Sequence, residues 1–339
     1  MSGSARGLQN LSVPNAIRPA NKTELRGGVM SEQERTVVQG ADEERHVAED
    51  DQFWGESYYL DFVADDGSLG GYVRIGYYPN LGVEWWTTAI VEPGKPTVLS
   101  VSYHAPMTPL PAMQAQGERY SATFEAKQPL ETFAVRVEAE AEEFADQAAP
   151  YRGESGTPVH LGIDLTWSSD GEPYHYEVAT RYEIPCLVSG QITLGDRVVE
   201  FQGQGQRDHS WGVRDWWIYG WCWSSARFDD GTRIHATDVR IPGVDVAFGY
   251  IQTPDGGFHV VDSARVTEDL GAEGFPSRCR AVLNNGDLDV TIEPLAFGPL
   301  LLTSPTGQLS RFPRAMARFT DQTGRTGLGW VEWNQPQDL

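Results

Sequence analysis

The residues best suited to chemistry lie in one stretch, residues 203–223, where ionisable groups occur among tryptophans. Asp208, His209 and Asp215 are the candidate catalytic residues, because carboxyl and imidazole groups are common proton donors and acceptors in enzymes. A carboxyl group beside apolar rings loses its hydration, which raises its pKa, so it can stay protonated near neutral pH and act as a general acid. Asp208 is therefore the predicted proton donor, and His209 or Asp215 could position a water molecule.

An aromatic row follows these groups along the chain. Trp217, Tyr219, Trp221 and Trp223 recur with a period of two, so on a β-strand they would share one face. Such a face is either part of a core or the wall of a site for an apolar ligand, and its rings could also stabilise a cation. Both interpretations stay open at this point. Further candidate substrate-binding residues are the neighbours of Asp208 and members of two other Trp-rich strands: Gln206, Trp211, Glu84, Trp85, Trp86 and Glu332.

Several other chemistries find no support in the sequence. The glycines around Gln204 do not continue into a GxGxxG loop between a strand and a helix, so a dinucleotide site is rejected. No Gly-x-Ser-x-Gly elbow is present, which argues against a serine hydrolase. The three cysteines, Cys186, Cys222 and Cys279, are not at metal-ligand spacing, and free thiols are expected. We therefore expect no metal and no cofactor.

The formal net charge of −22 restricts the partners. A surface this acidic repels phosphate backbones, so we expect no nucleic-acid partner. No uninterrupted apolar run reaches about 18 residues, so we expect no integral membrane segment. An apolar signal core is also missing at the N-terminus, and we expect a cytoplasmic protein. The sequence gives no indication of the oligomeric state.

Most of the chain reads as short β-strands separated by turns. Strand signals recur about every ten residues, with Asp-Gly, Pro-Asn and Asn-Gly punctuation, which is typical of antiparallel meanders. Residues 138–149, rich in Glu and Ala, are predicted to interrupt this pattern as a helix or a loop. About eight strands on each side of the middle could close into barrels or curved sandwiches. We expect an all-β fold with two β-domains, over residues 51–185 and 186–339. Residues 1–50 are expected to be a disordered extension, in which Met30 is an alternative start.

The motif around Asp208 resembles a known family. Residues 205–212, Gly-Gln-Arg-Asp-His-Ser-Trp-Gly, resemble the Gly-Tyr-x-Asp-x-Asn-x-Gly motif of the two-domain lipocalin-like family. That family includes carotenoid 1,2-hydratases, kievitone hydratase-like proteins, AttH-like proteins and fungal Diels–Alderases. The likeness is closer to an uncharacterised bacterial branch with the signature Arg-Asp-His-Ser-Trp-Gly-x-Arg-Asp-Trp. Residues 327–332 also resemble the ending of the family, and the resemblance covers residues 51–339.

This resemblance implies two lipocalin-like barrels in tandem and a role for Asp208. In the carotenoid hydratases, the motif aspartate is thought to protonate an isolated alkene, a nearby aromatic ring stabilises the tertiary cation, and water adds. Asp208 matches that acid by position. Gln206 and Ser210 stand where the family has Tyr and Asn. The Diels–Alderases use the same fold for a pericyclic reaction without an essential acid, so the fold alone does not select the reaction.

Three functions remain as hypotheses. The first is an enzyme acting on a hydrophobic, isoprenoid-like or polycyclic molecule such as a terpenoid or steroid. Its reaction would be acid-initiated hydration or dehydration of an alkene, or a related isomerisation or cyclisation, which makes it a lyase or an isomerase. The second is a non-catalytic lipid- or steroid-binding protein that uses one barrel as its calyx. The third is a structural module whose Trp rows are all core.

Overall fold

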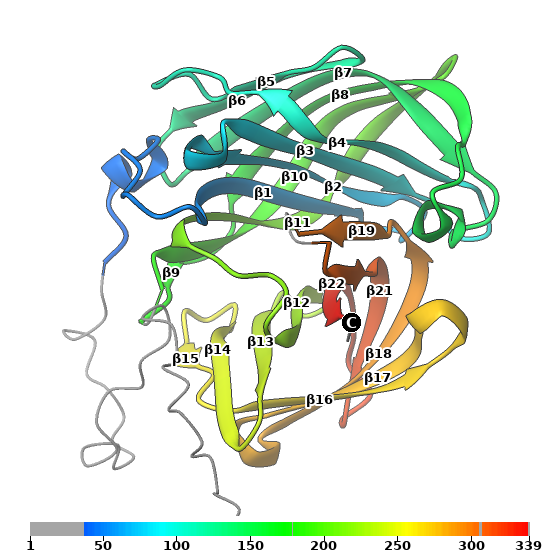
Figure 1. The fold of residues 1–339 in the computed structure, drawn as a ribbon. Coiled ribbons are helices and arrows are strands. Elements are labelled where there is room, and N and C mark those ends of the chain that lie inside the picture. The colour runs from blue at the N-terminus through cyan, green and yellow to red at the C-terminus, as the bar shows by residue number, and fades with distance from the viewer. Residues whose placement is uncertain (1–36, 178, 305–306, 338–339) are drawn as a thin grey trace, which may run out of the picture.

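The computed structural model describes residues 37–177, 179–304 and 307–337, which form two curved antiparallel β-sheets with one above the other in Figure 1. The predicted all-β class is confirmed. Residues 1–36, which make up most of the predicted disordered extension, lie outside the described residues. Within the described residues, no helix is long and apolar enough to cross a membrane.

The first sheet closes into a barrel. Its strands run in the order β4-β3-β2-β1-β11-β10-β8-β7-β6-β5, β9 pairs with β10, and an added pairing of β4 with β7 closes the ring. The strands are β1 (Trp54–Ala64), β2 (Gly70–Tyr78), β3 (Val83–Val91), β4 (Thr97–Pro106), β5 (Gln114–Gln116), β6 (Tyr120–Gln128), β7 (Thr132–Phe144), β8 (Thr157–Ser169), β9 (Tyr174–His175), β10 (Arg181–Leu194) and β11 (Arg197–Val213).

The second sheet is strongly curved and runs in the order β15-β14-β13-β12-β22-β21-β18-β17-β16. A hairpin of β19 and β20 joins it through β22. The strands are β12 (Gly220–Phe228), β13 (Arg233–Ile241), β14 (Val244–Gln252), β15 (Phe258–Val260), β16 (Ala264–Leu270), β17 (Pro276–Leu283), β18 (Leu288–Phe297), β19 (Leu300–Thr303), β20 (Leu309–Phe312), β21 (Arg314–Asp321) and β22 (Thr326–Pro336).

Helical structure in the described residues is limited to single 3₁₀ turns: η2 (Gly40–Glu43), η3 (Pro79–Leu81), η4 (Ala149–Arg152), η5 (Ala272–Gly274) and η6 (Asn284–Gly286). The predicted interruption at residues 138–149 is wrong over its first half, where β7 continues to Phe144. There, Ala139 and Ala141 are buried while Glu138 and Glu140 are exposed. The Glu-Ala alternation therefore follows the two-residue period of a half-buried strand.

The division between the sheets differs from the expected boundary at residue 185. The two longest strands, β10 and β11, form one hairpin that belongs to the first sheet, so the sheets divide between Val213 and Gly220. The described part of the expected extension, residues 37–50, is ordered. Glu43 and Val38 are buried, and the Glu43 carbonyl accepts a hydrogen bond from the Tyr58 hydroxyl at 3.1 Å. This segment covers one end of the first barrel (Figure 1).

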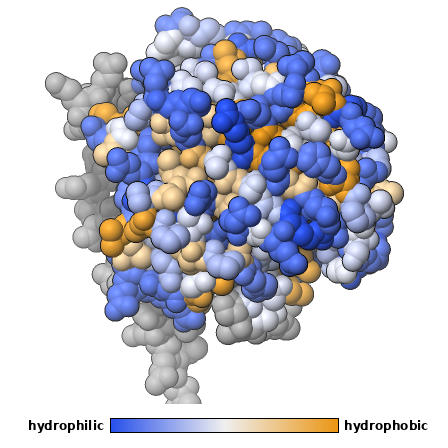
Figure 2. Space-filling model, turned by 90° about the horizontal axis from the view of Figure 1, so that it is seen from above, coloured by the Kyte–Doolittle hydropathy of each residue, from blue (hydrophilic) through white to orange (hydrophobic). Residues whose placement is uncertain are grey.

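The apolar side chains form three main cores. One fills the first barrel around Trp86, Trp167 and Phe133, and another fills the curve of the second sheet around Trp333. The third lies between the two sheets and contains Trp223, among other aromatic residues. Figure 2 shows that the upper face of the molecule carries many hydrophilic residues around a patch of hydrophobic ones, in keeping with the acidic composition.

Candidate active site

The site is built on β11, whose two faces look into different surroundings. Because side chains alternate along a strand, Asp208 faces the second sheet, whereas His209 faces the interior of the first barrel. The register of the barrel places Tyr59 of β1 and Glu183 of β10 on either side of Asp208. Asp208 and His209, which the sequence grouped together, therefore belong to separate sites.

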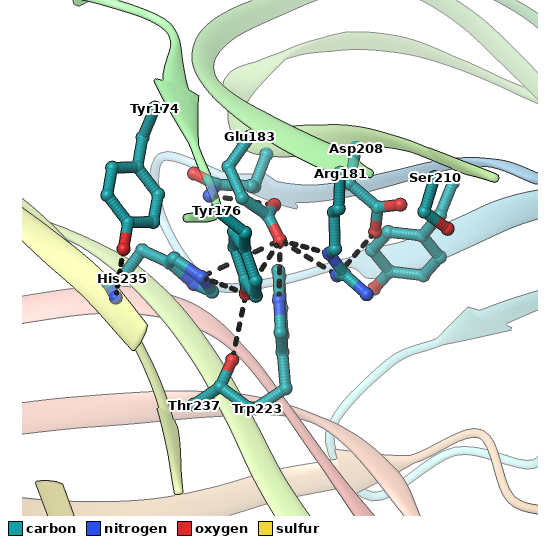
Figure 3. A network of polar contacts seen from close by, with 12 residues as sticks. Tyr174, Tyr176, Arg181, Glu183, Asp208, Ser210, Trp223, His235 and Thr237 are labelled. Carbon is teal, nitrogen blue, oxygen red and sulfur yellow. Dashed lines mark hydrogen bonds and ion pairs between the residues drawn. The ribbon is translucent and has the colours of Figure 1, made fainter. Parts of the chain in front are cut away.

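Asp208 lies beside a second buried acid, and one arginine serves both. Arg181 donates from Nη2 to Oδ2 of Asp208 at 2.8 Å and from Nε to Oε1 of Glu183 at 2.8 Å (Figure 3). The side chain of Asp208 is 5% exposed and that of Glu183 is fully buried. Two carboxyl groups and one guanidinium in such surroundings cannot all be charged without a net negative charge left in the interior.

Glu183 is also the centre of a hydrogen-bond network that joins the two sheets (Figure 3). The indole Nε1 of Trp223 donates to its Oε1 at 3.0 Å, and the amide of Gln206 donates to its Oε2 at 3.1 Å. The Tyr176 hydroxyl lies 3.3 Å from Oε1, and Nε2 of His235 lies 3.6 Å from the same oxygen. Glu183 is thus much better solvated by the protein than Asp208.

His235 has a defined tautomer in this network. Its Nδ1 lies 3.0 Å from the Ser224 carbonyl, which can only accept, so Nδ1 carries the hydrogen. Nε2 then accepts from the Tyr176 hydroxyl at 2.8 Å, and that hydroxyl also contacts Thr237 at 3.0 Å. Burial lowers the pKa of His235 to about 4, so the ring is neutral at physiological pH.

The surroundings separate the pKa values of the two acids. Burial raises the pKa of Asp208 to about 7, with Arg181 opposing the rise and Glu183 adding to it. Burial would also raise the pKa of Glu183, but Arg181 and the hydrogen bonds from Trp223 and Gln206 outweigh it and bring the net value below the ordinary range. Near neutral pH, Glu183 therefore keeps its negative charge while Asp208 exchanges a proton. This is the arrangement by which two carboxyl groups take different roles in acid–base catalysis.

Aromatic rings surround this pair. Of the predicted aromatic row, Trp221 and Trp223 lie on β12, while Trp217 and Tyr219 precede it in the connection between the sheets. Trp217, Trp221 and Trp223 all belong to the layer between the sheets, and Trp85 joins them, with its ring centroid 6.4 Å from that of Trp217. These tryptophans thus form a closely packed aromatic layer between the two sheets.

The other predicted site residues are distributed more widely. Trp86 and Glu84 point into the first barrel, where Trp86 donates to Ser100 and Glu84 accepts from backbone amides. Asp215 is exposed and accepts from the backbone amide of Trp217 at 3.0 Å. Glu332 is buried between the sheets and pairs with Arg314 at 3.2 Å.

A second polar cluster lies on the opposite face of β11, at the covered end of the first barrel. His209 and His46 approach Oε1 of Glu56 at 3.0 and 2.8 Å, and Trp211 stacks on His46 with ring centroids 3.9 Å apart. The ligand atoms of the two histidines and Glu56 all lie within 4.8 Å of one another, so this cluster has the composition to hold a transition-metal ion. Its hydrogen bonds also tie the residue 37–50 segment to β1 and β11, which is a structural role.

Cavities near the site are of two kinds. A polar cleft of about 510 Å³ is lined by Asp170, Arg227, Arg233 and Gln252, among others. A cavity of about 10 Å³ lies between the sheets beside Arg74 and Arg314. Asp208 lines neither of them.

The residues that sequence reasoning missed are the partners of Asp208. Arg181 and Glu183 have the two-residue spacing of one strand face. The Gly195-Asp196 turn also predicts a β10–β11 hairpin in which Leu194 faces Arg197, and continuing that register places Glu183 opposite Asp208. Tyr176 and His235 come from outside the motif. Tyr176 reaches the site through the turn between β9 and β10, where its backbone amide donates to the Arg181 carbonyl at 2.9 Å, whereas His235 reaches it because the sheets stack. No local pattern marks them.

Comparisons with known proteins agree with this architecture. A family profile described as "Domain of unknown function (DUF7064)" matches residues 39–337. A solved structure described as AttH from Nitrosomonas europaea has a TM-score of 0.64 and 17% identity, over 88% of this chain and 96% of that chain. Kievitone hydratase from Nectria haematococca has a TM-score of 0.60 and 10% identity, over 90% of this chain and 94% of that one. No sequence among curated proteins matches. At these identities the likeness shows a shared fold, so the predicted resemblance to AttH-like and kievitone hydratase-like proteins is confirmed for the fold.

Proposed function

We propose an enzymatic role for this chain, which belongs to the family described as Domain of unknown function (DUF7064): Asp208 donates a proton to a hydrophobic small molecule held between the two sheets. The observation that supports this most is the pair of buried carboxyl groups around the single guanidinium of Arg181. Glu183 has further donors in Trp223 and Gln206, so it holds the charge and leaves the proton on Asp208.

The reaction proposed is addition of water to an alkene, or its reverse. The proton of Asp208 forms a C–H bond as the alkene π bond breaks, and this leaves a carbocation and the Asp208 carboxylate. Rings of the layer, such as Trp223 and Tyr59 with centroids 5.7 Å apart, could stabilise that cation through their faces. Water then forms the C–O bond, and its surplus proton returns to Asp208, so that atoms and charge balance.

A hydrophobic, isoprenoid-like or polycyclic substrate fits this layer. Among the proteins of similar fold is kievitone hydratase, whose name describes addition of water. Isomerisation or cyclisation would begin with the same protonation and differ only in how the cation is quenched. We therefore propose a lyase or an isomerase, with hydration as the reaction to test first.

The test is turnover by an Asp208→Asn variant. Terpenoid and steroid alkenes are incubated with the wild-type protein, and products that have gained or lost water are identified by mass spectrometry. General acids contribute roughly 10²–10⁴-fold to rate, so we expect Asp208→Asn to lose at least about tenfold in kcat. The exposed Asp164→Asn change is the matched control and should leave kcat unchanged. Full activity of the Asp208 variant would exclude the proposed acid.

The pH dependence gives a second measurement of the same proton. Because the protonated acid is the active form, kcat should fall as pH rises through about 7. The raised native pKa also means that the folded protein binds this proton more tightly than the unfolded chain. Stability should therefore decrease as pH rises from about 4 to about 7, with a slope from this group of at most about 1.4 kcal/mol per pH unit. Asp208→Asn should remove that contribution.

Non-catalytic binding of a lipid or steroid is the alternative, and it too would use the space between the sheets. The interior of the first barrel is occupied by buried side chains such as Trp86, Trp167 and Phe133, which leaves little room for a calyx there. A ligand that binds without chemical change, and equally well to Asp208→Asn, would favour this alternative.

A further inference from the structure

A small cavity near the proposed acid lies among apolar side chains and residues that can bind an anion. It has a volume of about 10 Å³ and lies between the outer face of the first barrel and strands β19 and β21. The residues around it include two arginines and three other side chains with a hydrogen to donate: Arg74, Arg314, Thr87, Tyr103 and Trp216. The volume corresponds to about one water-sized group, such as a single ligand oxygen.

Arg74 is a buried cation without an acidic partner. It is 6% exposed, and no carboxylate of the described residues lies within 4.0 Å of its guanidinium. It donates a hydrogen bond to the Tyr78 hydroxyl at 3.3 Å and lies 5.4 Å from the centre of the Trp216 ring. Arg314, by contrast, is paired with Glu332. An uncompensated buried charge is costly in free energy, so its presence favours an anionic ligand.

Several of the residues around this cavity carry donors without acceptors. The hydroxyls of Thr87 and Tyr103, the indole nitrogen of Trp216 and Nη1 of Arg314 are all buried and have no hydrogen-bond partner among the described residues. Thr87 is 1% exposed, so bulk water does not solvate it. Buried polar groups are normally satisfied, and a cluster of unsatisfied donors around one cavity indicates an absent acceptor.

We propose that this cavity, which we call the anion subsite (Arg74, Thr87, Tyr103, Trp216 and Arg314), binds a carboxylate of the substrate, so that the substrate is a hydrophobic carboxylic acid. Each carboxylate oxygen can accept several hydrogen bonds, and arginine binds carboxylates strongly. The apolar body of the ligand would lie along the aromatic layer, with the ring of Trp85 displaced. This inference rests on the proposed function in that it takes the ligand to be the molecule that Asp208 protonates.

The anion subsite would also influence the acid. Burial raises the pKa of Asp208, while Arg181 and, more weakly, Arg74 oppose the rise. A carboxylate bound to Arg74 would cancel that opposition. Substrate binding would then favour the protonated form of Asp208, which is the form needed for catalysis.

The test compares ligands that differ only in their acidic group. Retinoic acid and retinol share one apolar body, as do abietic acid and abietinol, and their binding is measured through quenching of tryptophan fluorescence. We expect the wild-type protein to bind each acid at least about tenfold more tightly than its alcohol. Arg74→Met should abolish this preference, whereas the control Arg278→Met, at an exposed arginine of β17, should keep it.

Thr87→Val provides a second variant that preserves shape. It removes one unpaired hydroxyl, so it should fold normally and weaken binding of the acids by about threefold or more while leaving the alcohols unchanged. Arg74→Met should melt no lower than the wild type, because it removes an unpaired buried charge. Equal binding of acids and alcohols by the wild type in both pairs, or an acid preference that survives Arg74→Met and Thr87→Val, would overturn the proposal.

Asp208→Asn separates this inference from the proposed function. It should retain the acid preference and lose turnover. If it retains both, the proposed acid is wrong and the anion subsite stands. If Asp208→Asn loses turnover while the wild type shows no acid preference, the acid stands and the anion subsite is wrong.

Discussion

Two buried glutamates on strands that flank β11 show how similar residues can take different roles. Glu56 and Glu183 are 2% and 0% exposed, and each contacts a histidine and lies near an arginine. Glu56 is held by His209 and His46, and no second acid shares those partners in the described contacts. Glu183 shares Arg181 with Asp208. A buried ion pair therefore does not by itself mark a catalytic site. We propose that a second carboxyl group sharing the same arginine is what leaves a proton to transfer.

The largest expected effect comes from Glu183→Gln. Removing this negative charge takes away a cause that raises the pKa of Asp208, so Asp208 should become an ordinary carboxylate paired with Arg181. We expect at least about a tenfold loss of kcat near pH 7. We also expect about 2–4 kcal/mol of lost stability in urea unfolding, because a buried charge network is broken. The kcat limb that falls with pH should move to lower pH.

A spectroscopic measurement separates lost acid from lost fold. Infrared difference spectra of the wild type minus Asp208→Asn near pH 6 should show the carbonyl band of a protonated carboxyl group. The band should be weaker in Glu183→Gln. If the band in Glu183→Gln were as intense as in the wild type, Glu183 would not be what keeps Asp208 protonated. The proposed difference between Glu183 and Glu56 would then be wrong.

The fold could largely be predicted from sequence because strand period and turn residues are local signals. The failures arise where a local pattern fits two states. The Glu-Ala run before Phe144 suits a helix by composition, but its alanines fill the barrel core as a strand. The sheets divide after Val213 and not after residue 185, because the β10–β11 hairpin pairs with β8 on one side and with β1 on the other, and no local pattern encodes these long-range contacts.

The site was predictable only in part, for a related reason. Asp208 stood out because it lies in a motif among tryptophans. That Asp208 and His209 point to opposite faces of β11 could be predicted from their adjacent positions, because neighbouring side chains on a strand alternate. Arg181 and Glu183 reach Asp208 through the register of the β10–β11 hairpin, which its turn predicts. His235 reaches the site through the stacking of the sheets, which only the whole fold settles.

Glu56→Gln is the matched change on the other face of β11 and should have an intermediate effect. The amide keeps the shape but weakens the contacts with His209 and His46, which we expect to cost about 1–3 kcal/mol in urea unfolding. Protection of residues 37–50 from hydrogen exchange should fall as well. kcat should remain within about twofold of the wild type, because this cluster does not face Asp208. A tenfold loss of kcat with the stability unchanged would show that both glutamates serve catalysis.

The smallest effect is expected for Asp215→Asn, which tests the second carboxyl group that the sequence suggested as catalytic, after Asp208. Asp215 is exposed in the connection between the sheets, and its carboxylate accepts the backbone amide of Trp217, a contact that an asparagine side chain can keep. Stability should change by no more than about 0.5 kcal/mol, and kcat by less than about twofold. The kcat values of Asp215→Asn and Glu183→Gln should be measured on the same substrate. The two changes each remove one negative charge, the first at an exposed position and the second at a buried one. A large loss of kcat for Asp215→Asn would place the reacting group of the substrate at this connection and away from the face between the sheets.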